Sequence, residues 1–240
     1  MKILVLGDIH GHTEWREYIE NINPDLTIFL GDYVASFTVN SEDQIENFEN
    51  LLKYKEENPD KVILLRGNHD IQHLMGNVGC FECSGFFPEV GNYCQRNYER
   101  IMRDTQWVYI LKTDKETIVF SHAGITEQWF QDSECKAVED INALPPSELF
   151  GFRPTSIWDM YGESITQGCT WVRPLTLAQN PLHGYTQVVG HTGVKKILDI
   201  YKSVKDNQHI WLCDRLPHQC LLIEDGEFIV VDLKQPKNDT

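Results

Sequence analysis

The sequence has no long hydrophobic run and no recognisable export signal. No apolar stretch approaches the ~20 residues that a membrane-spanning helix needs. The N-terminus, MKILVLGDIH, has an apolar run too short for a signal peptide and lacks a small-residue cleavage site. We therefore expect a soluble, cytoplasmic protein without a membrane partner.

Positive charge is also scarce. Lys and Arg total 21 against 36 Asp and Glu, so the formal net charge is -15. Such an excess of negative charge repels nucleic-acid backbones and anionic membranes, which argues against both as partners. It is compatible with cation binding, although we expect most of these carboxylates to be solvated surface groups.

The cysteines do not form an obvious disulfide framework. There are seven, an odd number, scattered along a chain of 240 residues, which is typical of reduced thiols. Cys80-x-x-Cys83 could supply half of a zinc site together with Cys94. No fourth ligand is evident, so the alternative is that Cys80 and Cys83 are structural or incidental.

What the chain does contain is a regular alternation of strands and helices in its first part. The apolar runs Lys2–Leu6, Leu26–Leu30 and Lys61–Leu65 read as strands. Apolar residues at helical spacing predict helices over Thr13–Ile22 and Ser41–Glu57, the second opening with capping-box spacing. The order β-α-β-α-β is typical of a parallel sheet with helical crossovers.

The pattern is less regular in the rest of the chain. Residues 72–90 predict a loop-rich insert, and residues 150–184 an irregular aromatic segment with Trp158, Tyr161 and Trp171. The remaining expected elements are a helix over 93–103, a hairpin over 108–120, a short helical region over 127–144 and closing strands at 210–213, 220–223 and 228–232.

Five apolar runs end in Asp, His or Asn beside a glycine. The endings are Gly7-Asp8-Ile9-His10, Gly31-Asp32, Gly67-Asn68-His69, His122-Ala123-Gly124 and Gly190-His191. In open α/β sheets, functional residues collect at the carboxyl ends of strands. One such ending would mean little, but five predict a single shared site.

The polar residues at these endings are ligands for divalent metals. They are Asp8, His10, Asp32, Asn68, His122 and His191. Oxygen and nitrogen donors without thiolate suit Mn, Fe or Zn better than a structural zinc site of cysteines. Six ligands exceed the needs of one open catalytic ion, but they suffice for two ions with one bridging carboxylate. Such a pair activates water and holds the oxygens of an in-line phosphoryl transfer.

At these residues the sequence resembles the calcineurin-like metallophosphoesterase superfamily, and within it the phosphoprotein-phosphatase branch of the bacteriophage lambda phosphatase type. GDIHG, GDYV, LLRGNHD, SHAG and GHT occur in the family's order between positions 7 and 192. The resemblance implies an α/β fold with two mixed β-sheets packed face to face and helices outside. It also implies one domain over residues 1–240, with 72–90 and 150–184 as rims of the site.

The resemblance also implies a role for each matching residue. Asp8 and His10 would bind one metal, Asp32 would bridge, and Asn68, His122 and His191 would complete the second. A bridging hydroxide would attack phosphorus, His69 would protonate the leaving oxygen, and Arg66 would clamp the phosphate. Arg173 is the candidate for a second clamp, with a surface ion pair as its alternative. Manganese is the expected metal, with iron, zinc, nickel or magnesium as alternatives.

One departure from the family pattern concerns the residues after Asp32. The pattern there is Gly-Asp-x-Val-Asp-Arg-Gly, whose second Asp orients the catalytic His, but this chain has Ala35 and Ser36 in place of the Asp and Arg. We expect a carboxylate or a backbone carbonyl from elsewhere to orient His69. The motif at 190–193 is GHTG rather than GHTH, which favours the phosphoprotein-phosphatase branch over the cyclic-nucleotide phosphodiesterases.

Two classes of function are compatible with these residues. The favoured one is a metal-dependent phosphoric ester hydrolase, acting on phosphoproteins, on diadenosine polyphosphates or other nucleotides, or on small phosphomonoesters. The other is a catalytically silent scaffold on the same fold. A scaffold would be free to lose ligands or the acid, whereas all six ligands and His69 are present.

Overall fold

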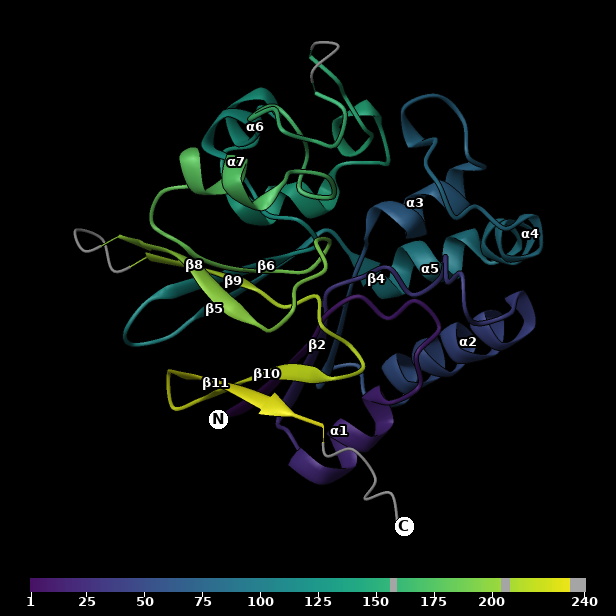
Figure 1. Cartoon of the computed structure of the whole chain (residues 1–240), viewed down its shortest axis with the longest axis horizontal. Helices are drawn as coiled ribbons and strands as arrows, with labels where there is room; N and C mark the ends of the chain where they lie inside the picture. The colour runs from purple at the N-terminus through teal and green to yellow at the C-terminus, as the bar shows by residue number, and fades with distance from the viewer. Residues whose placement is uncertain (156–158, 204–207, 234–240) are drawn as a thin grey trace.

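The computed structural model describes residues 1–155, 159–203 and 208–233, and its main chain forms two mixed β-sheets (Figure 1). Trp158 lies outside the described residues. In spatial order, the first sheet contains β11 (Glu227–Asp232), β10 (Gln219–Glu224), β1 (Lys2–Leu6), β2 (Leu26–Phe29), β3 (Val62–Leu65) and β4 (Thr105–Gln106). The second contains β5 (Val108–Lys112), β6 (Thr117–Ser121), β7 (Thr186–Val189), β9 (Gln208–Leu212) and β8 (Leu198–Ser203).

The two sheets pack face to face through the alternating side chains of their strands. In β1, Ile3 and Val5 belong to a buried cluster that also contains Phe120 of β6 and Val188 of β7. The residues of opposite parity, such as Leu4, lie in a different cluster with the helices. This is the period of two that a strand buried on both faces requires.

Helices cover the outer faces of the sheets (Figure 1). On the side of the first sheet lie α1 (Trp15–Ile22), α2 (Ser41–Glu57), α3 (Asn68–Met75), α4 (Pro88–Arg96) and α5 (Tyr98–Asp104). Beyond the second sheet lie α6 (Glu127–Asp132), α7 (Pro174–Gln179) and the short 3₁₀ turns η2 (Val138–Ala143) and η3 (Glu148–Phe150), while η1 (Gly79–Phe81) follows α3. The fold expected from the resemblance, two mixed sheets with flanking helices, is confirmed.

Several local predictions need correction. The side chain that caps α2 is Asn40, which accepts a hydrogen bond from the backbone nitrogen of Asp43 at 2.9 Å, rather than Ser41. The helix expected over 93–103 is part of two helices that meet at Asn97. The Asn97 amide donates to the carbonyl of Tyr93 at 2.9 Å, a local bond that competes with helix continuation. Strands β4 and β8 were not predicted.

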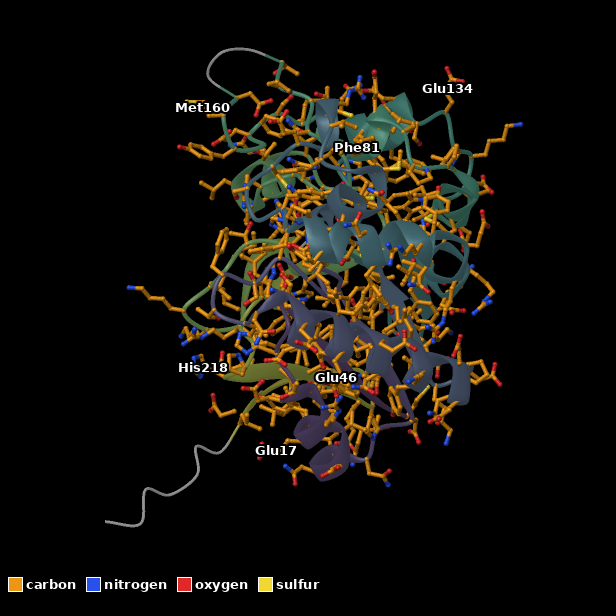
Figure 2. All side chains as sticks on the ribbon, turned by 90° about the vertical axis from the view of Figure 1, so that its right-hand side faces the viewer. Glu17, Glu46, Phe81, Glu134, Met160 and His218 are labelled. Atoms are coloured by element: carbon orange, nitrogen blue, oxygen red, sulfur yellow. The ribbon has the colours of Figure 1, made fainter. Side chains whose placement is uncertain are left out.

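The acidic residues are spread over the surface. Glu17, Glu46 and Glu134 come from different segments; in Figure 2 the first two lie in the lower part of the molecule and Glu134 lies near the top. In the same view Phe81 and Met160, one from each segment expected to form a rim, both lie in the upper part of the molecule. Among the described residues, no helix combines the length and hydrophobicity that crossing a bilayer would require.

Candidate active site

The carboxyl ends of strands from both sheets open onto one cavity of about 360 Å³. Strands β1, β2 and β3 run parallel in the first sheet, and β6 and β7 run parallel in the second. The residues that follow these strands therefore meet at one edge of the sandwich. Those that line the cavity are Asp8, His10, Asp32, Asn68, His69 and His191. His122 lies directly behind them and is fully buried.

The six expected metal ligands form two groups that share Asp32. In the first group, Nε2 of His10 lies 3.9 Å from carboxylate oxygens of both Asp8 and Asp32. In the second, Oδ1 of Asn68 lies 3.0 Å from Nε2 of His122 and 2.9 Å from Nδ1 of His191. Nε2 of His122 is 3.4 Å from the Asp32 carboxylate. All six sites predicted from sequence are thus brought together.

The backbone fixes the tautomers of two of these histidines. Nδ1 of His10 donates to the carbonyl of Val34, and Nδ1 of His122 donates to the carbonyl of Leu30, each at 2.8 Å. In the neutral rings each Nε2 therefore points a lone pair at the oxygens around it. Hydrogen bonds of this kind orient metal-binding imidazoles. Oxygen and nitrogen acceptors that face one another at such short distances fit divalent cations between them.

The pKa values of the charged groups also indicate a site for cations. Burial of the His122 ring disfavours its charged form, but Asp32 and Asp8 outweigh burial and raise its pKa to about 10. Burial would raise the pKa of Asp32, yet His122 and His69 lower it well below its usual range. Burial and the nearby Asp214 raise the pKa of Asp8. Several carboxylates packed without solvent favour a positive charge among them.

Two positions of the site require glycine because a carboxylate packs closely against the backbone there. A Cβ on Gly67 would overlap Oδ1 of Asp32, and a Cβ on Gly190 would overlap Oδ1 of Asp8. Both glycines precede a ligand, so the absent side chain leaves room for the carboxylate of a neighbouring strand. Backbone strain is also concentrated here, since His10, Asp32 and His191 have φ of 42°, 51° and 63°.

Asp70 holds the two loops of the site together. Its carboxylate accepts from the backbone nitrogens of Asp32, Tyr33 and Gly67 at 2.8, 2.9 and 2.8 Å. These donors come from the ends of β2 and β3. Asp70 therefore positions the loop that carries Asp32 without lining the cavity itself.

The expected clamp at Arg66 is contradicted. Its guanidinium turns away from the cavity, and the residue is 4% exposed. Nε donates to Oγ1 of Thr105 at 2.7 Å, Nη2 donates to the carbonyl of Met102 at 3.0 Å, and the group stacks on Trp107 at 4.5 Å. Arg66 thus ties the end of β3 to α5 and β4. Met102, Thr105 and Trp107 are distant from Arg66 in the sequence, so the local sequence pattern could not predict these contacts.

Arg173, by contrast, lies at the cavity. Nη1 donates to Oγ1 of Thr192 at 3.2 Å, and Nε donates to the carbonyl of Tyr161. Within the described ranges it is the one Lys or Arg that lines the cavity, which Glu82 also lines. Tyr161 and Trp171 also line it, together with Phe152 and Met160, so the segment 150–184 contributes one wall.

The partner of His69 differs in chemistry from the one expected. Neither a carboxylate nor a backbone carbonyl contacts its Nδ1; instead Oε1 of Gln72 lies 3.1 Å away. Ala35 and Ser36 do not reach the cavity. Their loop is held by Gln44, whose Oε1 accepts from the backbone nitrogen of Ser36 at 3.0 Å.

Asp214 lines the cavity but was not predicted from the sequence. Asp214 directly follows the apolar run of β9, which is the same signal as at the other strand ends but without an adjacent glycine. Cys83 also lines the cavity, with Sγ 3.7 Å from Nδ1 of His69. All the cysteines are free. In the described part of the chain, Asp8, His10 and Asp32 are the one group of three or more His, Cys, Asp or Glu residues whose ligand atoms all lie within 4.8 Å of one another, as a metal site requires. A zinc site at Cys80, Cys83 and Cys94 is therefore unsupported.

Comparison with known proteins places this chain among the phosphoesterases that are built on two packed β-sheets. A family model described as calcineurin-like phosphoesterase matches residues 1–202. The chain belongs to that family.

Individual relatives are distant. A symmetrical bis(5'-nucleosyl)-tetraphosphatase from Proteus mirabilis is 27% identical over 170 residues, covering 68% of this chain and 58% of that protein. The serine/threonine-protein phosphatase 6 catalytic subunit of Drosophila melanogaster is 23% identical over 199 residues, covering 73% and 61%. The chain thus spans about three fifths of the length of these relatives.

Solved structures agree on the fold. A protein serine/threonine phosphatase from Saccharomyces cerevisiae with similarity to human phosphatase PP5 superimposes with a TM-score of 0.59 at 14% identity, covering 99% of this chain and 82% of the other. A metallophosphoesterase from Sphaerobacter thermophilus gives 0.52 at 13% identity, covering 98% and 90%. These superpositions confirm the two-sheet fold.

Proposed function

We propose that this protein is a metal-dependent phosphomonoesterase of the serine/threonine-phosphatase-like type. The observation that carries the proposal is the convergence of Arg173, His69 and five of the six candidate metal ligands on one cavity, with the sixth, His122, buried behind them. Asp8, His10 and Asp32 would hold one divalent ion, and Asp32, Asn68, His122 and His191 a second, with manganese as the first candidate. When bound, the ions supply an activated water and neutralise developing charge on the phosphoryl oxygens.

The residues of the chain then bind the ester and handle a proton. Arg173 can donate from its guanidinium to a non-bridging phosphate oxygen, since it lines the cavity. His69 lines the same cavity and can donate a proton from Nε2 to the departing oxygen. Phe152, Tyr161 and Trp171 give that wall an apolar surface for the organic part of the ester.

The alternative substrate is a diadenosine polyphosphate or another nucleotide. The 27% identical tetraphosphatase supports this alternative. The charges of the cavity lining oppose it, because one arginine together with Glu82 leaves little positive charge for a chain of several phosphates. The monoester proposal is therefore the better supported of the two.

The test is hydrolysis by metal-free protein reconstituted with Mn²⁺. The substrates are p-nitrophenyl phosphate, bis-p-nitrophenyl phosphate, a phosphothreonine peptide and diadenosine tetraphosphate, with Asp32→Asn as the control variant. We expect turnover of the monoester and the peptide, lost in the variant. Turnover confined to the dinucleotide or the diester would overturn the monoesterase assignment. Bound metal without turnover of any ester would favour a scaffold.

A further inference from the structure

His69 and Gln72 form a hydrogen-bonded pair within α3. They are three residues apart, a spacing that places two side chains on neighbouring positions of one helix face. Oε1 of Gln72 lies 3.1 Å from Nδ1 of His69. Gln72 is fully buried, whereas His69 reaches the cavity. The glutamine thus contacts the ring from behind, on the side away from the substrate space.

A chain of hydrogen bonds determines which end of the Gln72 amide faces the histidine. The backbone nitrogen of Cys83 donates to Oδ1 of Asn77 at 3.2 Å, and Nε2 of Gln72 donates to the same oxygen at 2.7 Å. Nε2 of Gln72 also donates to the backbone carbonyl of Cys83. Backbone groups cannot exchange donor and acceptor roles. The two anchors on Cys83 therefore fix both amides, and the oxygen of Gln72 must point at His69.

We propose that Gln72 is the positioning residue of His69: it accepts the Nδ1 hydrogen and so presents Nε2 to the cavity. An acceptor at Nδ1 requires that this nitrogen carries a hydrogen in the neutral ring. Nε2 is then the atom that gains and loses a proton. This inference deepens the proposed function and rests on the role assigned there to His69.

The same hydrogen bond serves both states of the proton transfer. The imidazolium donates its Nε2 proton to the leaving oxygen as the P–O bond breaks, and the electron pair of that bond stays on the oxygen. The neutral ring that remains keeps its Nδ1 hydrogen on Gln72. No tautomer change or ring rotation is required after the proton leaves.

A neutral partner also suits the electrostatics of this position. The backbone nitrogen of His69 donates to Oδ1 of Asp32 at 2.9 Å, and Asp70 is fully buried in the same helix turn. A carboxylate in place of Gln72 would be a further buried negative charge beside these two. The amide provides the acceptor without that cost, which explains how the site functions with Ala35 at the departure from the family pattern.

The first test is the tautomer of His69, measured by ¹⁵N NMR on the zinc-loaded protein. Zinc is diamagnetic, and a His69→Ala variant assigns the signals. We expect the neutral ring to carry its hydrogen on Nδ1 in the parent protein and to lose this fixed tautomer in Gln72→Leu. A ring that carries its hydrogen on Nε2 in the parent would overturn the proposal.

The second test uses leaving groups, on the manganese-loaded enzyme. Gln72→Leu should lower kcat for phenyl phosphate about 10- to 100-fold, with KM nearly unchanged, and should lower kcat for p-nitrophenyl phosphate far less. The better leaving group needs little help from an acid. In a His69→Ala background the same substitution should have no further effect. Equal losses on both esters, or a loss that persists without His69, would show a merely structural role.

Two further variants complete the design. Asn77→Gly removes the anchor of the Gln72 amide while keeping a residue suited to φ of 54°, and it should give the same leaving-group pattern with a smaller loss. Gln128→Leu, a glutamine in α6 away from the cavity, is the matched control and should leave both rates unchanged. If the Nδ1 tautomer is observed but no ester is hydrolysed, the proposed function is refuted, whereas the hydrogen-bonded pairing of Gln72 with His69 stands.

Discussion

The carboxylate of Asp32 lies 3.4 Å from Nε2 of His122, although one follows a strand of the first sheet and the other a strand of the second. This contact joins the two sheets at the edge where the site forms. It also makes Asp32 the common member of both ligand groups.

Replacing Asp32 by Asn should strongly weaken metal binding at this shared position. We expect at least ~100-fold weaker Mn²⁺ binding, because the amide carries no charge and a single oxygen. Titration calorimetry on the metal-free protein measures the change. Asp225→Asn, at an exposed turn whose side chain is 83% exposed, is the matched control and should bind as the parent does. Unaltered affinity in Asp32→Asn would remove this carboxylate from the ligand set.

The two arginines should separate stability from activity. Arg66→Met removes buried charge-assisted hydrogen bonds and should lower the free energy of unfolding by ~2–4 kcal/mol while leaving KM for the ester little changed. Arg173→Ala should lower kcat/KM about 10- to 100-fold with little change in stability, because its guanidinium faces the cavity.

Urea unfolding and steady-state kinetics on both variants test this pair. Arg173→Lys is the control, and it should recover part of the activity because it keeps the charge but loses the planar fork. A lower kcat/KM in Arg66→Met at full stability would restore Arg66 as a phosphate ligand.

His73 should limit stability in acid. Burial lowers the pKa of this ring to about 4, and its two nitrogens contact the carbonyl of His69 and the backbone nitrogen of Phe87. The folded pKa lies below the unfolded value of about 6.5, so the unfolded chain binds the proton first. The contribution of His73 to the free energy of unfolding is fully present above pH 6.5. It falls by roughly 3 kcal/mol as the pH drops toward 4.

The comparison that isolates His73 is urea unfolding of the parent and of His73→Gln between pH 4 and 7.5. The variant keeps an acceptor for Phe87 but cannot titrate in this range. Its stability should therefore fall less steeply with acid. Parallel curves for the two proteins would assign the acid sensitivity to other groups.

Gly190→Ala should displace a metal ligand. The added methyl group would overlap Oδ1 of Asp8, so the carboxylate must move. We expect a large loss of metal affinity, about 100-fold, with a modest loss of stability. Gly193→Ala is the control, since its methyl would lie an ordinary 3.5 Å from Asp214. Metal binding and thermal unfolding of both variants provide the readout, and equal affinities would contradict the packing argument.

The sequence by itself determined the parts of this protein that depend on local pattern. The apolar run of β1 and the helical spacing of α2 predicted the parallel part of the first sheet. The polar residues beside glycines at strand ends predicted the six side chains that meet at the site. Such residues must converge because the carboxyl ends of parallel strands share one edge. The missing partner of His69 was also evident from the sequence, since Ala35 cannot accept a hydrogen bond.

Only the tertiary structure decided where individual side chains turn. Arg66 follows a strand just as a phosphate ligand would, but Thr105 and Trp107 offer it buried partners that no local pattern announces. Gln72 was expected at the start of a loop-rich insert, but it lies in α3, where Cys83 folds back and fixes its amide. Asp214 reaches the cavity because β9 lies beside β7. In each case the outcome depends on contacts between segments distant in sequence, whose geometry exists only once the chain has packed.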